Sequence, residues 1–339
     1  MSVIRNYAPV LLAAIAAGML SVGCGANGLP PWENYPVGQQ QAYVVRSEMP
    51  VPSLPITEEK TGAIFLDNKH DTFEEGVISV NNSSYEIPQK LIDAVWDTMA
   101  EYRFETGFYV IDLETRMSFG LNVDHEYSAA STVKAPYALY VAKQLDAGAI
   151  ALDDILEYRE EHYCTGSGST QYSEYGTLFT LKALFYRMLY NSDNVAYYML
   201  SQYTGVDGFN EMLSSLGINS SVTRLDHWCD MTPRDLATIW SEIWDFKDTC
   251  ESGQLLWKYL TTNLYNEFDV AMPEFEPNEC AHKSGWNHYG YHESGIVSAK
   301  RQYICVVMTA TGNRNDCLHR TIRNLDNIMN DYDTWLKNQ

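Results

Sequence analysis

One serine and one lysine in this sequence have a spacing that suits nucleophilic chemistry. Ser131 and Lys134 form a Ser-x-x-Lys step at the start of a segment with helical periodicity, which places both side chains on one face. A serine hydroxyl becomes a strong nucleophile only when a base takes its proton. Lysine serves as that base after burial and a nearby cation favour its neutral form. The N-terminus of the helix would also stabilise a developing oxyanion. The structural alternative is a capping serine followed by a solvated lysine.

Two further triplets follow along the chain. Ser-Asp-Asn at 192–194 opens another helical segment and, by itself, is typical of a helix cap. Lys-Ser-Gly at 283–285 lies inside a predicted strand, where lysine is disfavoured unless it protects a sheet edge or has a chemical role. A similar triplet, Lys-Thr-Gly at 60–62, precedes Ser131 and has no partner. Such motifs are weak singly, so their order and spacing carry the inference.

The periodicity of the apolar residues predicts the elements that position these motifs. A helix is expected over 87–103, followed by a hairpin of strands at 107–113 and 117–121. A helical block then covers about 131–264. Its helices are expected at 131–145, 180–190, 194–202, 208–216 and 233–244, the later strands at 280–285, 290–299 and 302–311, and the last helix at 316–336. The sequence therefore predicts a two-lobed α+β protein, with an antiparallel sheet flanked by N- and C-terminal helices and an inserted all-α lobe.

Composition excludes several classes of protein. The chain has 339 residues, of which 45% are hydrophobic, 24 are Tyr and 8 are Trp. These values are typical of a packed globular body and not of a disordered, collagen-like or coiled-coil chain. The formal net charge of −21 would repel phosphate backbones, so nucleic acid is not expected as a partner.

The N-terminal region has the layout of an export signal. Residues 1–23 contain one charge, Arg5, then an apolar run too short to span a bilayer comfortably and small residues before Cys24. The stretch resembles a bacterial lipoprotein signal, in which this cysteine is lipidated, and cleavage of a plain signal near the same point is the alternative. Residues 24–84, rich in Pro, Gln and Glu, are expected to form a largely disordered spacer. The protein is therefore expected outside the cytoplasm, anchored to the bacterial cell membrane by the lipid on Cys24.

In order, Ser-x-x-Lys, Ser-Asp-Asn and Lys-Ser-Gly are the motifs of class A β-lactamases and penicillin-binding proteins, and the chain resembles that superfamily. The resemblance spans about 85–337 and extends to four further stretches. These are 108–112, 145–148, 222–226 and the Thr-Pro pair at 232–233. It implies a β-lactamase/transpeptidase-like fold over 85–339 and a serine hydrolase that uses no cofactor and no metal.

The resemblance also assigns catalytic roles. Ser131 would be the nucleophile that becomes acylated, and Lys134 would accept its proton. Ser192 would relay a proton to the leaving nitrogen. Asn194 would hold Lys134 and the amide of the substrate, and Lys283 would supply positive potential.

Three residues at the end of the same predicted strand, Ser284, Gly285 and Trp286, are expected to bind the substrate. Ser284 would hydrogen-bond the substrate carboxylate. The backbone N–H groups of Trp286 and Ser131 would form the oxyanion hole, where charge develops on one oxygen during acyl transfer.

One departure from the family pattern affects the release of the acyl group. The position of the glutamate that activates the deacylating water holds Cys229, and the loop around it is almost absent. Because general-base catalysis is worth about 10²–10⁴-fold, an acyl-serine without this base is expected to persist. Asp230 is the possible substitute. Cys229 is also a candidate for a disulfide, for example with Cys164, although the six cysteines beyond Cys24 allow fifteen connectivities.

A second departure concerns the carboxylate of the substrate. Family members often place an arginine on the strand after Lys-Ser-Gly, and this chain has none there. Either His288 or His292 replaces it at acid pH, or the carboxylate is bound differently. With His282, these histidines match no zinc spacing, so surface and hairpin roles are expected for them.

The combined prediction is an exported, monomeric serine hydrolase of class A β-lactamase type. It would form an acyl-enzyme on Ser131 with β-lactams or related D-alanyl amides and release it slowly. One alternative is a D,D-carboxypeptidase or transpeptidase that admits cell-wall stem peptides through the cleft left by the missing loop. The other is a non-hydrolytic penicillin-binding or sensing lipoprotein that is acylated once or not at all.

Overall fold

The computed structural model describes residues 63–66, 77–80, 83–86, 90, 93–94, 97, 106–275, 280–298, 300–312 and 315–338. Its central element is a six-stranded sheet with the order β1-β5-β4-β12-β11-β10. The strands are β1 (Ala63–Leu66), β5 (Ser118–Leu121), β4 (Thr106–Asp112), β12 (Gln302–Thr309), β11 (Tyr291–Ser298) and β10 (Cys280–Trp286). β1 is parallel to β5, and the other neighbouring strands are antiparallel.

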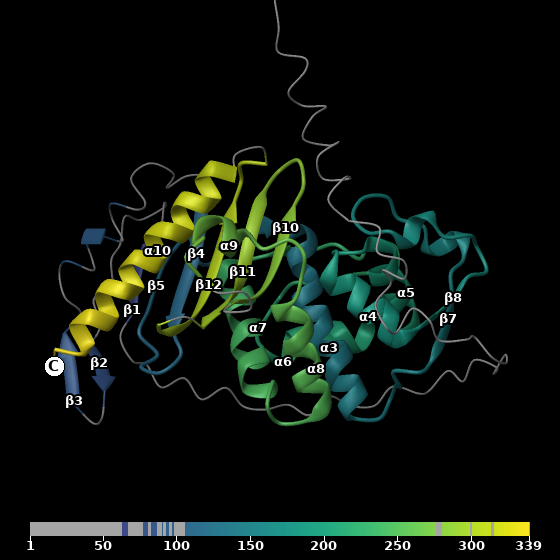
Figure 1. The fold of residues 1–339 in the computed structure, drawn as a ribbon, viewed down its shortest axis with the longest axis horizontal. Coiled ribbons are helices and arrows are strands. Elements are labelled where there is room, and N and C mark those ends of the chain that lie inside the picture. The colour runs from purple at the N-terminus through teal and green to yellow at the C-terminus, as the bar shows by residue number, and fades with distance from the viewer. Residues whose placement is uncertain are drawn as a thin grey trace, which may run out of the picture. The chain divides into compact units, whose positions relative to one another are not determined.

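Helices cover both faces of this sheet. α10 (Asn315–Leu336) and the short α9 (Glu267–Ala271) pack on one face, and α7 (Pro233–Phe246) packs on the other (Figure 1). Successive side chains of a strand point to opposite faces, so Ile304 joins the core on the α7 side and Cys305 the core on the α10 side. Burial on both faces explains why β12 reads as a nearly continuous apolar run.

The helical lobe is inserted between β5 and β10. At its centre, α3 (Lys134–Asp146) packs against α4 (Leu181–Tyr190) and α8 (Glu251–Thr261). Most residues of α3 are buried, including its first residue, Lys134. The two remaining helices are α5 (Asn194–Thr204) and α6 (Asp207–Ser215). Because neighbouring helices cover α3, its first residue, Lys134, is kept away from water. This burial could not be inferred from the position of Lys134 in the sequence.

The predicted α+β class is confirmed, with one difference in the inserted lobe. The lobe is not all-α, because β7 (Ile155–Glu157) and β8 (Leu178–Thr180) form a hairpin within it. In addition, β9 (Asp230–Met231) pairs with β6 (Tyr127–Ser128), just before the nucleophile segment. These strands are two or three residues long, too short to show the alternation that predicts a strand.

The segment expected to be a spacer contains regular structure. Besides β1, the strands β2 (Val77–Val80) and β3 (Ser83–Glu86) form an antiparallel hairpin at its end. The structure therefore differs from the expected disorder of 24–84 at these residues. The described positions of the helix expected at 87–103 are helical, namely Lys90, Asp93, Ala94 and Asp97. The signal sequence 1–23 and Cys24 lie outside the described residues.

Two other findings complete the fold. Cys164 and Cys229 are free thiols, so the disulfide suggested between them is not formed. Within the part of the chain that the structure describes, no helix has both the length and the apolar character needed to cross a lipid bilayer.

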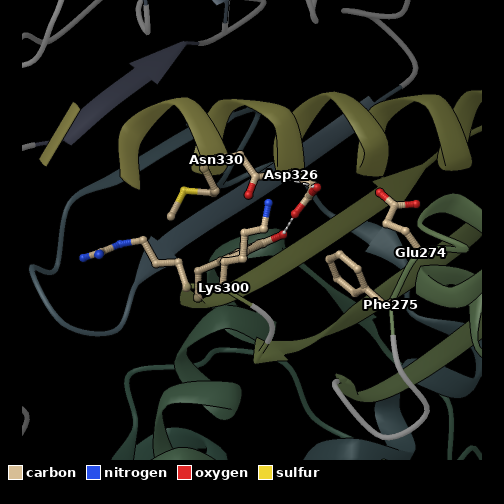
Figure 2. Close-up of a pocket in the computed structure, with 8 residues that line it drawn as sticks. Glu274, Phe275, Lys300, Asp326 and Asn330 are labelled. Carbon is tan, nitrogen blue, oxygen red and sulfur yellow. Dashed lines mark hydrogen bonds between the residues drawn. The ribbon is translucent and has the colours of Figure 1, made fainter. Parts of the chain in front are cut away.

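A cavity of about 340 Å³ lies between α10, the start of β12 and the segment after α9 (Figure 2). Its described lining residues are Glu274, Phe275, Lys300, Arg301, Tyr303, Asp326, Met329 and Asn330. Asp326 is buried there and accepts hydrogen bonds from Tyr303 and Asn330. These lining residues include no member of the three motifs, so the chemistry predicted from the sequence is not centred on this cavity.

Candidate active site

Ser131 and Lys134 meet where a short 3-10 turn, η1 (Ala130–Val133), runs into α3. Nζ of Lys134 lies 3.1 Å from Oγ of Ser131, within hydrogen-bonding distance. Ser131 is partly exposed, whereas Lys134 is fully buried. The predicted pair is therefore formed, with a hydroxyl that solvent can reach and an amine that it cannot.

The Ser-Asp-Asn triplet surrounds the same amine. Nζ of Lys134 donates to the backbone oxygen of Ser192 over 2.5 Å, to Oγ of Ser192 over 3.2 Å and to Oδ1 of Asn194 over 2.7 Å. With Ser131, the amine has four acceptors and at most three protons. A neutral amine has two protons and one lone pair, and it could accept a proton from one of the two serine hydroxyls. The arrangement therefore suits proton transfer from serine to lysine.

A loop that the sequence analysis did not identify holds this triplet in place. Asn194 donates from Nδ2 to the carbonyl of Thr165 over 2.9 Å, and its backbone N–H donates to the carbonyl of Ser167 over 3.0 Å. Gly168 has φ +98°, and a Cβ there would lie 2.2 Å from Cγ of Asp193. The sequence signal was the alternation of Gly and Ser at 166–169, which allows the backbone to approach this closely.

The third motif lies on β10, the edge strand next to η1. Lys283 is buried and pairs across the sheet with Ser294 on β11. A Cβ on Gly285 would lie 2.6 Å from the backbone nitrogen of Thr132 and 2.9 Å from that of Ser131. Glycine at this position therefore lets β10 approach the 3-10 turn η1 closely. The three motifs, far apart in the sequence, are brought together.

The two other predicted substrate-binding residues of β10 differ in their exposure. Ser284 is buried and donates from Oγ to the carbonyl of Tyr265 over 3.1 Å. A hydroxyl has one proton, so Ser284 would have to exchange this bond to donate to a substrate carboxylate. Trp286, at the end of the strand, is 58% exposed. Its ring is therefore open to a bound ligand.

The two buried lysines differ in their protonation. Burial lowers the pKa of Lys134 well below its usual value, and the positive charge of Lys283 lowers it further. Burial also lowers the pKa of Lys283, to about 8, against the opposing effect of the Glu293 carboxylate. At neutral pH, Lys283 is therefore mainly a cation, while the environment of Lys134 favours the neutral amine that a base requires.

Backbone strain is stored on both sides of Lys134. Ala130 and Ser192 are not glycines, and they adopt left-handed conformations with φ +46° and φ +56°. Such conformations cost about 1–3 kcal/mol each and cluster at functional sites. Ala130 directly precedes the nucleophile, and Ser192 supplies two of the acceptors of Lys134.

The sequence was compared with models of known protein families. A model described as "Beta-lactamase enzyme family" matches residues 88–332, which is most of the chain. The chain belongs to the β-lactamase enzyme family. A search of the curated proteins found no match.

Several solved structures have the same fold as this chain. The structure of PBP-A has a TM-score of 0.65 and 20% sequence identity, and the match covers 71% of this chain and 96% of that chain. A β-lactamase from Sphaerobacter thermophilus DSM 20745 has a TM-score of 0.62 and 23% identity, with coverage of 71% and 95%. The TLA-3 extended-spectrum β-lactamase has a TM-score of 0.63 and 17% identity, with coverage of 72% and 98%. The fold class and the resemblance to class A β-lactamases and penicillin-binding proteins are confirmed.

An aromatic side chain faces the amine of Lys134 from the segment where the family pattern has its glutamate. The centroid of the Trp228 ring lies 5.4 Å from Nζ of Lys134. Cys229, the expected occupant of the glutamate position, is partly buried, and burial together with the nearby Asp230 raises the pKa of its thiol to about 12. Sequence alone placed the departure at Cys229, whereas the structure places the neighbouring ring beside Lys134.

Asp230, the possible substitute base, has an exposed side chain on β9, where its Cα lies opposite that of Ser128. In the described structure, the four hydrogen bonds of Lys134 go to Ser131, Ser192 and Asn194, and none goes to Asp230. A catalytic role for Asp230 stays a prediction.

Surface and hairpin roles were expected for three histidines; His288 agrees with this, whereas His282 and His292 are buried. His292 is buried, and burial lowers its pKa to about 4. Its Nδ1 accepts from the backbone N–H of Thr309, so its Nε2 carries the proton that is donated to the carbonyl of Ser128. A neutral, enclosed ring cannot replace the missing arginine. His282 is likewise buried and not at the surface, whereas His288 is exposed on the turn between β10 and β11.

Proposed function

We propose that this protein forms a covalent acyl-enzyme on Ser131 with β-lactams or related D-alanyl amides, and that the acyl group is released slowly. The observation that carries the proposal is the buried amine of Lys134, 3.1 Å from the Ser131 hydroxyl and enclosed by two other motif residues. Membership of the β-lactamase enzyme family supports this chemistry.

The proposed acylation uses each motif in turn. Neutral Lys134 takes the proton from Ser131, and Oγ attacks the amide carbon of the ligand. The charge that develops on the amide oxygen is stabilised by the backbone N–H groups of Ser131 and Trp286. The C–N bond breaks, Ser192 gives its hydroxyl proton to the leaving nitrogen, and Lys134 returns its proton to Oγ of Ser192 over 3.2 Å and becomes neutral again. The Lys283 ammonium attracts the carboxylate of the ligand.

Slow release of the acyl group is expected because no free carboxylate base is described next to the ester on Ser131. A water molecule must lose a proton as it attacks, and a positioned base typically contributes about 10²–10⁴-fold to such a step. Within the described structure, the carboxylate of Asp193 acts on Lys134, and its negative charge opposes the lowering of the Lys134 pKa. Its oxygens already accept from the backbone N–H groups of Ala196 and Thr170, so it is held as the cap of α5.

The proposal is tested by labelling with a fluorescent penicillin, followed by intact-mass measurement of adduct decay. Wild-type protein is expected to gain one adduct that persists, and Ser131→Ala is expected to lose labelling while its circular dichroism spectrum stays unchanged. Labelling of Ser131→Ala would refute the assignment. Rapid loss of the adduct would indicate an efficient β-lactamase. Release of D-alanine from stem peptides would indicate a D,D-peptidase, and absence of an adduct on the wild type would indicate a binding protein.

We further propose that the protein acts as a monomer outside the cytoplasm, attached to the bacterial cell membrane by lipid on Cys24. The support is the signal-like layout of residues 1–23. Metabolic labelling with a fatty acid should mark the wild type and not Cys24→Ala. Equal labelling of both would refute the anchor, and a dimer by light scattering would refute the monomer.

A further inference from the structure

The position of Trp228 suggests a second reason for slow release. We propose that the Trp228 ring excludes the hydrolytic water from the Lys134 side of the acyl-serine, so that it sets the lifetime of the adduct together with the missing carboxylate. This inference rests on the proposed acylation of Ser131 and concerns the step after it.

Trp228 is held by the residues on both sides of it. The backbone N–H of Trp228 donates to Oδ1 of Asp226 over 3.1 Å, and the carbonyl of His227 accepts from the Tyr197 hydroxyl over 2.7 Å. The carbonyl of Cys229 accepts from the backbone N–H of Ala129 over 3.1 Å. The segment is thereby fixed both to the helical lobe and to the stretch just before the nucleophile.

The ring completes an apolar wall around the base. Its centroid lies 5.6 Å from that of Tyr197, a fully buried residue of α5. Nζ of Lys134 lies 5.4 Å from the Trp228 centroid and 5.9 Å from the Tyr197 centroid. Beside its hydrogen-bond acceptors from Ser131 and the Ser-Asp-Asn triplet, the amine therefore has two aromatic rings close to it. The charges of Lys283, Asp193 and Cys164 also act on it.

This arrangement blocks one chemical step and leaves the earlier one free. In acylation, the proton moves directly from Ser131 to Lys134 over 3.1 Å, and no water is needed. In hydrolysis, the oxygen of a water must bond to the acyl carbon while its proton passes to a base. The bond between that carbon and Oγ of Ser131 then breaks, and Oγ regains a proton. A water placed to give its proton to Lys134 needs polar partners, and the ring faces of Trp228 and Tyr197 offer none. The Tyr197 hydroxyl donates to the carbonyl of His227, and the Trp228 side chain forms a hydrogen bond with Tyr198.

The test compares adduct lifetimes of substitutions at Trp228 after acylation by penicillin G, measured by intact mass. Trp228→Phe keeps a ring and is expected to retain the lifetime within about threefold. Trp228→Gln admits water to Lys134 without adding a carboxylate and should shorten the adduct lifetime about tenfold. Trp228→Glu adds a base and should shorten it by at least about 100-fold, following the range for general-base catalysis. The matched control is Leu225→Glu, which adds the same charge to the same segment at a residue that is 97% exposed.

The acylation rate separates this role from a structural one. A residue that only supports the fold would change acylation and decay together, whereas the proposed wall changes decay and leaves acylation within about threefold. Unchanged lifetimes in both the Gln and Glu variants would overturn the proposal. So would a short lifetime in Glu alone, because the missing base would then be the whole cause. If Trp228→Glu does not fold, the Phe and Gln variants test the proposal. Only exclusion of water by the ring predicts a shorter adduct lifetime in the Gln variant than in the Phe variant. No adduct on the wild type would instead refute the proposed function.

Discussion

Replacement of Lys283 by methionine is expected to stabilise the fold while it abolishes acylation. Burial lowers the pKa of Lys283 from 10.5 to about 8. At pH 7 the charged side chain therefore costs the folded state about 3 kcal/mol, at about 1.36 kcal/mol per pKa unit. Methionine removes this cost, but it also removes the hydrogen bond from Nζ to the carbonyl of Ser284, worth about 1 kcal/mol. The net gain is about 2 kcal/mol, or about 4–8 °C in Tm for a domain of this size.

The pH dependence gives the prediction its sign. Below pH 8, Lys283 is protonated in both the folded and the unfolded chain, so the full cost applies. Between pH 8 and 10.5 the unfolded chain still binds the proton that the folded chain has released, so this cost disappears as the pH rises. The advantage of Lys283→Met over the wild type should therefore be present at pH 7 and lost by about pH 10.5.

Urea unfolding at several pH values measures this difference. Lys258→Met, which removes an exposed lysine, is the matched control and should change the free energy of unfolding by no more than about 0.5 kcal/mol. A variant less stable than the wild type at pH 7, or an advantage independent of pH, would refute the reasoning that Lys283 is held in the site against a cost of burial. Functional sites commonly lower the stability of the folded protein in this way.

Three further perturbations test other parts of the site. Gly285→Ala places a Cβ 2.6 Å from the backbone nitrogen of Thr132, so acylation should fall about 10²-fold in stopped-flow labelling; a loss below threefold would mean that β10 shifts at no cost. Cys229→Glu should leave the adduct lifetime within about tenfold, because Trp228 and not Cys229 faces Lys134, and a hundredfold shorter lifetime by intact mass would contradict this. Burial lowers the pKa of His292 from 6.5 to about 4, so its neutral ring stabilises the fold above pH 6.5 and the contribution is lost as the pH falls through 4. Acid unfolding of His292→Gln should be less steep in this window, and identical curves would argue against the buried neutral ring.

Several of the predicted elements were predictable because local chemistry fixes their ends. Thr232 and Asp235 form a capping box with Pro233 at the first helical position, and α7 begins there as expected. The strand expected at 280–285 appears as β10 (Cys280–Trp286), which ends where the turn residues at 287–290 begin. The order of the three motifs predicted a single site, and the structure brings the motif residues together.

Other parts of the site depend on contacts that local sequence does not encode. The carbonyls of Thr165 and Ser167 hold Asn194, and a carbonyl has the same chemistry in every residue, so no side chain marks it. Trp228 was overlooked because a difference of one position decides which side chain faces Lys134. β1 (Ala63–Leu66) has four apolar residues without a polar alternation, and only its pairing with β5 identifies it as a strand.

The pairing of β4 with β12 has a consequence for folding during synthesis of the protein. These central strands come from opposite ends of the domain, and β10, which carries Lys283, precedes β12 by only a short stretch. A ribosome makes the chain from its N-terminus, so the contiguous helices from α3 to α8 can begin to condense before either late strand exists. A chain truncated before Cys280 should therefore form helices but should not react with penicillin, because β10 and its Lys283 would not yet lie beside Ser131 and Lys134.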